Sequence, residues 1–364
     1  MVARLLSVVV AGTLGWMGVA NAQDDQVNIY NWAEYTAEDT IPGFERQSGK
    51  KVQYDTYDSN DTLQAKLLTG SSGYDIVVPS THYAKRQIEA GLFQKLDKSQ
   101  IPNWDNLDPA IMQLLTPVDP NNEYLVPWGY GTNALGFNVT KAQEILGSGA
   151  KLNDWSLLFD PEKAKQFESC GISVLDEAAQ VFPAALHYMG KDPNSSNPED
   201  YREALAMLKQ VRPYIRQFSS SGYIDELASG DLCLVYAYSG DVLIAGDRAE
   251  QAGRDYKIDF FLPDDGAPAW FDTMAVPADA PNPQGAFEFI NYFNQPEVSA
   301  DITNEMFYPN ANQAARSLVK PSVANNEAIY PPPEVAQNLF VIEAQPLDIQ
   351  RLQTRLWAEL KSGR

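Results

Sequence analysis

The chain has 364 residues, 44% of them hydrophobic, which is enough for two domains with cores of their own. Its 48 acidic residues outnumber its 27 basic ones, so the formal net charge is −21. An acidic excess of this size argues against nucleic acid and anionic membrane surfaces as partners, and it weakly favours a cationic ligand.

Residues 1–22 have the features of a secretory signal peptide. One positive charge, Arg4, precedes an apolar run from Leu5 through Trp16, and Ala20-Asn21-Ala22 offers a small-residue cleavage site. No cysteine follows that site to carry a lipid anchor. We therefore expect a mature protein that is free in the periplasm.

The chain has two cysteines, Cys170 and Cys233, and two histidines. In an oxidising compartment the cysteines are expected to form one disulfide that closes a loop of roughly 60 residues, with two buried free thiols as the alternative. Two histidines cannot build a histidine-rich metal site, so we expect no metal and no other cofactor.

The first half of the mature chain alternates strand patterns with helix patterns. Strands are expected at 27–30, 51–57 and 74–78, and helical stretches end at Gly49 or cover 59–68 and 80–90, with Ser59 as an N-cap. This alternation predicts βαβ units and a mostly parallel sheet. Two apolar strands, 125–128 and 132–138, then run almost continuously across Gly129-Tyr130-Gly131.

The second half has a similar pattern. Helices are expected at 177–188, 198–211 and 241–252, and strands at 232–238 and 257–261. A short helix at 223–229 is closed by Gly230. The pattern predicts a second α/β domain of similar size.

Aromatic residues accompany a carboxylate at the carboxyl ends of several predicted strands, which is where open α/β sheets bind ligands. The groups are Trp32-Ala33-Glu34-Tyr35, Tyr238-Ser239-Gly240-Asp241 and Trp270-Phe271-Asp272, with a further pair at Phe307-Tyr308. Carboxylates and aromatic faces hold ammonium groups, and flat apolar walls suit the methylenes between them. The pattern favours an elongated organic polycation. The alternative is that these rings only border the core and that Asp241 only caps a helix.

These groups belong to a longer series that includes Tyr57-Asp58-Ser59-Asn60, the stretch 74–80 and Tyr308-Pro309-Asn310-Ala311-Asn312. The series resembles the periplasmic polyamine-binding proteins of putrescine and spermidine ABC importers over essentially the whole mature chain. The resemblance implies a type II periplasmic binding protein, an α/β fold of two lobes, each a mostly parallel sheet flanked by helices. Two crossover strands, near Gly131 and Gly246, would join the lobes, and Cys170 and Cys233 would match the disulfide of the family. One lobe would take 26–132 plus 248–306, and the other 133–247 plus 307–364.

The resemblance also implies which residues bind the ligand. To these we add His82, which follows the strand end at Ser80 and has a surface or capping role as its alternative. The predicted ligand-binding residues are Trp32, Glu34, Tyr35, Ser80, His82, Gln180, Tyr238, Asp241, Trp270, Asp272 and Tyr308.

Three positions bear on which amine is bound. Ala33 replaces a hydroxyl common in putrescine-type members, and Gln180 stands where several members carry a carboxylate. Trp270 is similar to the spermidine-preferring members, where putrescine-preferring ones often have Phe. We therefore predict spermidine over putrescine, with agmatine, or a loss of polyamine binding, as the alternatives within the family.

The predicted function is binding without catalysis. A polyamine would bridge the lobes, and the closed form would deliver it to the membrane permease of an ABC importer, with the protein acting as a monomer. A glycoside hydrolase would also use paired carboxylates and aromatic rings, but the ordered motifs argue against it. A ferric-ion-binding protein would need adjacent tyrosine ligands and basic groups, whereas the predicted site is acidic.

Overall fold

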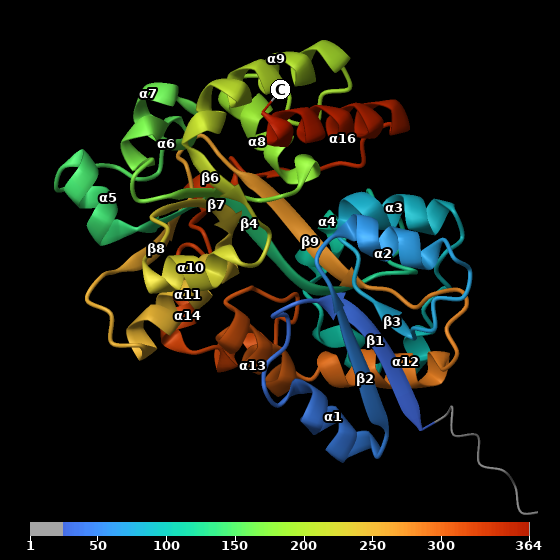
Figure 1. The fold of residues 1–364 in the computed structure, drawn as a ribbon. Helices are drawn as coiled ribbons and strands as arrows, with labels where there is room; N and C mark the ends of the chain where they lie inside the picture. Colours follow the sequence, from blue (N-terminus) through green and yellow to red (C-terminus); the bar gives the residue numbers. More distant parts are fainter. Residues whose placement is uncertain (1–24, 364) are drawn as a thin grey trace, which may run out of the picture.

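The structure is a computed structural model that describes residues 25–363, so the predicted signal peptide at 1–22 lies outside the described residues. Two α/β lobes lie side by side, and two long strands, β4 (Val126–Asn138) and β9 (Pro268–Met274), run between them (Figure 1). Within 25–363 no helix is long and apolar enough to cross a membrane.

The first lobe contains a three-stranded parallel sheet in the order β2-β1-β3. Its strands are β1 (Gln26–Trp32), β2 (Lys51–Tyr57) and β3 (Ile76–Val77). The predicted N-cap is confirmed, because the Ser59 hydroxyl accepts a hydrogen bond of 3.2 Å from the Thr62 amide. The helices of this lobe are α1 (Thr40–Ser48), α2 (Asn60–Leu67), α3 (Thr81–Glu89), α4 (Pro109–Leu114), α12 (Pro283–Phe293) and α13 (Pro296–Met306).

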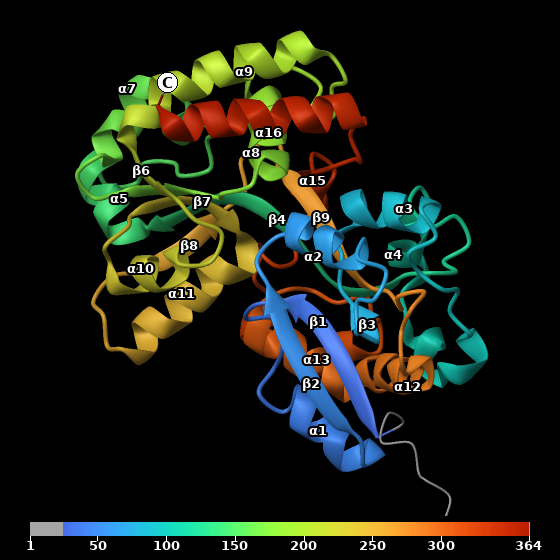
Figure 2. The same ribbon diagram turned by 45° about the vertical axis from the view of Figure 1, so that its right-hand side comes forward.

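The second lobe has a mixed sheet rather than a mostly parallel one. Strands β5 (Ile172–Val174), β6 (Ile215–Phe218) and β7 (Leu234–Tyr238) are parallel, whereas β4 pairs antiparallel with both β7 and β8 (Ile258–Phe261). Helix α16 (Leu347–Ser362) packs against α8 (Ala178–Tyr188) and α9 (Pro198–Val211) at the top of Figure 2, with α10 (Tyr223–Ser229) and α11 (Ser239–Gln251) below the sheet.

The remaining elements are short. They are α5 (Val139–Leu146), α6 (Ser156–Phe159), α7 (Pro161–Ala164), α14 (Pro321–Ala324), α15 (Pro333–Ala336) and β10 (Phe340–Val341), together with short 3₁₀ helices at Lys98–Gln100, Pro102–Asn106, Lys165–Phe167, Arg212–Tyr214 and Ala315–Leu318.

Strand β4 is the first crossover that the sequence predicts. Its residues 126–132 pair with β9, and its residues 133–137 pair with β7, so one strand passes from lobe to lobe. The second crossover predicted near Gly246 is wrong, because Gly246 lies inside helix α11. Strand β8 pairs with residues 135–138 of β4, which keeps the chain in the second lobe as far as Phe261. The lobe boundaries remain a proposal, and we propose that the return to the first lobe lies in β9.

The predicted disulfide is confirmed. Cys170 and Cys233 are bonded, with their Cα atoms 5.7 Å apart. They precede the neighbouring parallel strands β5 and β7, in which Ile172 pairs with Leu234. The bond therefore joins the entries to two adjacent strands of the second-lobe sheet.

Candidate ligand-binding pocket

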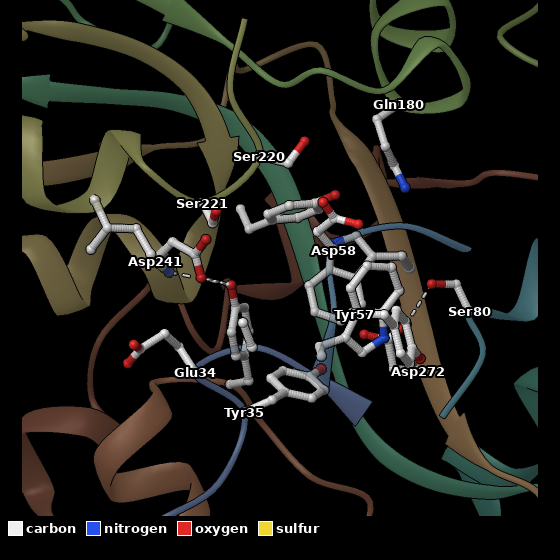
Figure 3. A pocket seen from close by; sticks show the side chains of 16 residues that line it. Glu34, Tyr35, Tyr57, Asp58, Ser80, Gln180, Ser220, Ser221, Asp241 and Asp272 are labelled. Carbon is white, nitrogen blue, oxygen red and sulfur yellow. Dashed lines mark hydrogen bonds between the residues drawn. The ribbon is translucent and has the colours of Figure 1, made fainter. Parts of the chain in front are cut away.

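A pocket lies between the lobes, where β1 and β7 end and β9 crosses (Figure 3). Ten of the eleven predicted ligand-binding residues line it, and His82 does not. Those ten are Trp32, Glu34, Tyr35, Ser80, Gln180, Tyr238, Asp241, Trp270, Asp272 and Tyr308. Ala33, Tyr57, Asp58, Ser220, Ser221 and Ile224 also line it. The lining residues include no lysine or arginine within the described chain.

The crossing strands form one wall of this pocket, and glycines let its rings approach closely. Gly131 of β4 pairs with Trp270 of β9, and Gly129 pairs with Asp272. A Cβ atom on Gly131 would lie 2.7 Å from the Trp270 indole and 3.1 Å from the Tyr308 ring, so no larger residue fits there without a shift. The aromatic rings that pack directly on β4 therefore explain why its apolar run contains glycine at positions 129 and 131.

Aromatic rings form the other walls. The Trp270 ring centroid lies 5.8 Å from that of Tyr238 and 5.2 Å from that of Tyr308, with the planes at steep angles. Across the pocket, the rings of Trp32 and Tyr57 lie 4.7 Å apart. Such faces and edges can enclose a methylene chain and can hold an ammonium group over a ring.

Gln180 holds one of these walls in place. Its side-chain oxygen accepts a 2.7 Å hydrogen bond from Asn133, and the Asn133 oxygen accepts one of 2.8 Å from the Trp270 indole. The amide nitrogen of Gln180 points towards the pocket (Figure 3). A carboxylate at this position would add negative charge, whereas the amide fixes the tryptophan and leaves this corner neutral.

Asp272 is the most enclosed acid of the pocket, with 5% of its surface exposed. It accepts a 2.5 Å hydrogen bond from the Ser80 hydroxyl, and Ser80 is itself held by two 3.0 Å hydrogen bonds with Asn60. Burial raises the pKa of Asp272 to about 7, although the Ser80 hydrogen bond opposes the shift. An ammonium group placed here would favour the ionised carboxylate.

Asp241 is a second acid that forms no ion pair in the described chain. It lies in the first turn of α11 and accepts hydrogen bonds from the hydroxyls of Tyr223 at 2.6 Å and Tyr308 at 2.8 Å. Desolvation raises its pKa to about 6, against the effect of those two hydrogen bonds. The helix terminus and the hydroxyls support a carboxylate that still lacks a counter-ion.

Glu34 differs from both of these acids. Its backbone is left-handed, with φ of 54°, and its side chain is 56% exposed. The carboxylate forms a 2.9 Å ion pair with Arg248 of α11, and Arg248 also contacts Asp225 at 2.7 Å. Glu34 therefore lies at the rim of the pocket, in an ion pair that joins the two lobes.

His82 lies in an adjoining cavity, beyond Tyr238, with Asp61, Tyr83 and Glu177. It is 5% exposed, and neither ring nitrogen has a hydrogen-bond partner among the described residues. Burial lowers the pKa of His82 to about 4, so the ring is neutral at pH 7. The prediction that His82 lines the main pocket is therefore wrong: His82 lies in the first turn of α3 and lines the adjoining cavity.

Glu177 is an acid beside the pocket that was not among the residues predicted from the sequence. Its carboxylate accepts a 3.1 Å hydrogen bond from the Tyr238 hydroxyl, and Tyr238 lines the main pocket. Burial raises the pKa of Glu177 to about 7, and the nearby acids Asp61 and Asp272 add to the shift. In the sequence, an acid just before an apolar helix is typical of a solvated N-terminal residue. Only the contact with Tyr238 in the folded protein places Glu177 next to the pocket.

Other lining residues were also missed. Tyr57 and Asp58 end strand β2 with the same aromatic and acidic pattern used for the other groups, so the sequence carried a signal for them. Ser220, Ser221 and Ile224 come from the turn before α10 and its first residues, where no pattern marks a site.

Two α/β lobes on crossing strands, with an acidic and aromatic pocket between them, define a type II periplasmic binding protein. Residues 41–331 match the family model described as bacterial extracellular solute-binding protein, and the chain belongs to this family. The family binds solutes and is not enzymatic.

Similar proteins align with this chain over nearly its full length. The putrescine-binding periplasmic protein PotF of Escherichia coli is 44% identical, and the aligned region covers 99% of this chain and 98% of that protein. The putrescine-binding periplasmic protein SpuD of Pseudomonas aeruginosa is 42% identical over the same shares of both chains. A solved structure described as a spermidine/putrescine ABC transporter protein of Listeria monocytogenes matches with a TM-score of 0.83 and 28% identity, covering 93% of this chain and 100% of that one.

Proposed function

We propose that this protein captures an aliphatic polyamine between its lobes in the periplasm and delivers it to the membrane permease of an ABC importer. One observation carries the proposal. Asp241 and Asp272 are enclosed carboxylates with raised pKa values, and neither forms an ion pair within residues 25–363; Arg248 acts on Asp241 only from a distance. A ligand with two ammonium groups would supply both missing charges.

The rings between these acids suit the rest of such a ligand. Trp270 and Tyr308 border the space between them, so methylenes would lie on aromatic faces, at about 0.8 kcal/mol for each buried CH₂. An ammonium group over a ring would add roughly 0.5 to 2 kcal/mol. Sugars and amino acids with neutral side chains would leave at least one of the two carboxylates unpaired in an enclosed site, which is costly.

Within the polyamines we propose a preference for spermidine over putrescine. Glu177 supports this preference, because it is a third enclosed acid, separated from the main pocket by Tyr238, and could pair with the third ammonium group of a triamine. The larger Trp270 wall supports it too. The names of PotF and SpuD favour putrescine instead, so the choice of amine needs its own measurement.

Calorimetric titration of the refolded, ligand-stripped mature protein with spermidine and putrescine tests the proposal. Refolding removes amines that co-purify. We expect a dissociation constant at or below about 1 μM for at least one amine. The absence of a binding heat with both amines would refute polyamine capture, whereas tighter binding of putrescine would refute only the preference for spermidine.

A pair of variants then tests the reason for the preference. Glu177→Gln should weaken spermidine binding about tenfold and leave putrescine binding nearly unchanged, because only the triamine reaches this acid. Glu343→Gln is the matched control, since Glu343 is an exposed acid in the same adjoining cavity. Equal losses for both amines in Glu177→Gln would contradict the assignment.

A further inference from the structure

The crossing strands have a second face that the proposed function does not use. Side chains alternate along a strand, so Ala269 and Phe271 face away from the main pocket, while Trp270 between them borders both spaces. On β4, Tyr130 and Thr132 share that other face. These four residues form the floor of what we call the rear cavity.

The rear cavity is large enough for a small molecule. Its volume is about 630 Å³, within the range of about 300 to 1,000 Å³ that is usual for ligand pockets. Leu114 of α4 and the segment 328–341 form its sides. The main pocket and the rear cavity therefore lie on opposite faces of the same two strands.

The walls of the rear cavity are flat and mostly apolar. The rings of Tyr130 and Phe271 lie 5.3 Å apart on its floor. Tyr330, Pro331 and Pro332 line it from the C-terminal segment. Flat faces on two sides suit a planar aromatic ring, which stacks better than a branched or linear chain.

One cation lines this cavity. The Arg316 guanidinium lies 3.3 Å over the Tyr330 ring, and it forms no ion pair with any residue that the structure describes. Its protein hydrogen bond, to the Ala324 carbonyl, is long at 3.5 Å. Asp108, which lines an adjacent hollow with Arg316, accepts instead from the Ala110 amide at 2.8 Å. In a chain with a net charge of −21, an unpaired arginine at an apolar cavity is a ready site for an anion.

A second polar group of the floor also lacks a partner. Thr132 is 6% exposed, and its hydroxyl has no hydrogen-bond partner in the described part of the chain. Buried hydroxyls are nearly always paired, so an unpaired one at a cavity indicates a missing partner. The exposed guanidinium is stacked on Tyr330, and its planar fork can bind a carboxylate with two parallel hydrogen bonds in place of its long contact with Ala324.

We propose that the rear cavity binds a small aromatic monocarboxylate, with its ring between Tyr130 and the proline wall and its carboxylate on Arg316. This site is separate from the polyamine pocket and has the opposite charge preference. Because both sites use β4 and β9, an occupant of the rear cavity should change the affinity of the front pocket, and the reverse should hold to the same degree.

The test uses 2-naphthoate as the probe and the ligand-stripped mature protein. Calorimetry should give saturable binding of one naphthoate per chain, with a dissociation constant below about 1 mM. The neutral analogue 2-naphthamide should bind at least about tenfold more weakly, because it cannot form the charged hydrogen bonds. Arg316→Gln should cause a similar loss. Arg202→Gln, at an exposed arginine of α9, is the control and should bind like the unmodified protein.

Three outcomes would overturn the proposal. They are the absence of saturable binding up to about 1 mM, equal binding by Arg316→Gln, or a gain of about tenfold or more in Asp241→Asn, which would place the naphthoate anion in the front pocket beside that carboxylate. Arg316→Lys guards against misfolding, because it keeps the charge and loses the planar edge. Its naphthoate affinity should fall between those of the unmodified protein and Arg316→Gln.

Discussion

The inner part of the main pocket and its rim both present carboxylates, but in opposite electrostatic states. Asp241 and Asp272 are enclosed, have raised pKa values and form no ion pair within 25–363. Glu34 at the rim is 56% exposed and already pairs with Arg248. A cationic ligand should therefore interact strongly with the inner acids and only weakly with the rim acid.

This difference shows why counting acids near a pocket is a poor guide to affinity. An exposed ion pair contributes about 0 to 1 kcal/mol, because water screens it and the side chains lose freedom. Breaking an enclosed pair costs about 3 to 5 kcal/mol, because one charge is left unpaired. The predictions below test whether the inner and rim acids differ by that much.

The largest effect is expected for Asp241→Asn. The substitution keeps the shape of the side chain and removes its charge, so an ammonium group at this end would be left without a counter-ion. We expect polyamine binding to weaken by about 3 to 5 kcal/mol in calorimetry. Asp247→Asn, an exposed position on the same helix, is the control. An affinity within tenfold of the unmodified protein would remove Asp241 from the site.

The pH dependence of binding should follow the inner acids. The ligand amines stay protonated up to pH 8, whereas Asp241 and Asp272 have pKa values of about 6 and about 7 in the free protein. A bound cation favours their ionised forms, so binding releases protons when the pH is below these values. Affinity should rise by at least about tenfold from pH 5 to pH 8 and then level off.

Calorimetry in buffers with different ionisation enthalpies measures the released protons directly. About one proton should leave per ligand near pH 6, and close to none at pH 8.5. An affinity that is flat between pH 5 and pH 8 would mean that these carboxylates do not face the ligand charges.

Asp272 should also reduce the stability of the ligand-free protein. Its pKa is raised from 3.8 to about 7 on folding, so the folded state holds more protons than the unfolded chain between these values. The free energy of unfolding therefore falls as pH rises from 4 to 7. Asp272→Asn removes this loss and should stabilise the ligand-free protein at pH 8 by about 1 to 3 kcal/mol, while it weakens polyamine binding.

Thermal unfolding of the ligand-free proteins at pH 4 and pH 8 provides the measurement. The advantage of Asp272→Asn should be present at pH 8 and absent at pH 4. Asp225→Asn, an exposed acid with 82% of its side chain accessible, should show no such gain. A loss of stability at pH 8 would mean that the ionised carboxylate is better solvated than its burial indicates.

The sequence was sufficient to predict much of the fold and most of the pocket, because both depend on local patterns. The alternation of strands and helices, the disulfide and the strand through Gly129 and Gly131 are all confirmed. The ends of β1, β2 and β7 meet at the pocket, as expected for open α/β sheets, whereas Trp270 and Asp272 lie inside β9, which crosses antiparallel to β4.

The features that the sequence did not predict depend on contacts between segments far apart in the chain. The crossover near Gly246 was implied by the resemblance, whereas the local pattern predicted a helix at 241–252, and α11 lies there. The pairing of β8 with β4 then keeps the following chain in the second lobe. His82 of α3 and Glu177 at the start of α8 are far apart in sequence but line the same adjoining cavity, which forms only where the two lobes approach each other. The Arg248 partner of Glu34 is 214 residues away and left no local signal.

A smaller effect is expected at the aromatic wall. Trp270→Phe removes part of the wall and the indole hydrogen bond to Asn133, which also links to Gln180. We expect spermidine binding to weaken by about 1 kcal/mol and putrescine binding by less, because the longer amine covers more of the wall. Competition between the two amines on one sample gives the ratio directly. An unchanged ratio would mean that Trp270 does not set the preference.

The smallest effect is expected at the rim. Glu34→Gln removes the ion pair with Arg248 but leaves both inner acids in place, so polyamine binding should weaken by less than about 1 kcal/mol. That loss should shrink further in about 0.5 M salt, because exposed charges are screened. Arg248 then keeps Asp225 as its partner, which limits any new repulsion at the entrance. A loss as large as that of Asp241→Asn would show that Glu34 leaves Arg248 to bind the ligand, and the distinction between inner and rim acids would fail.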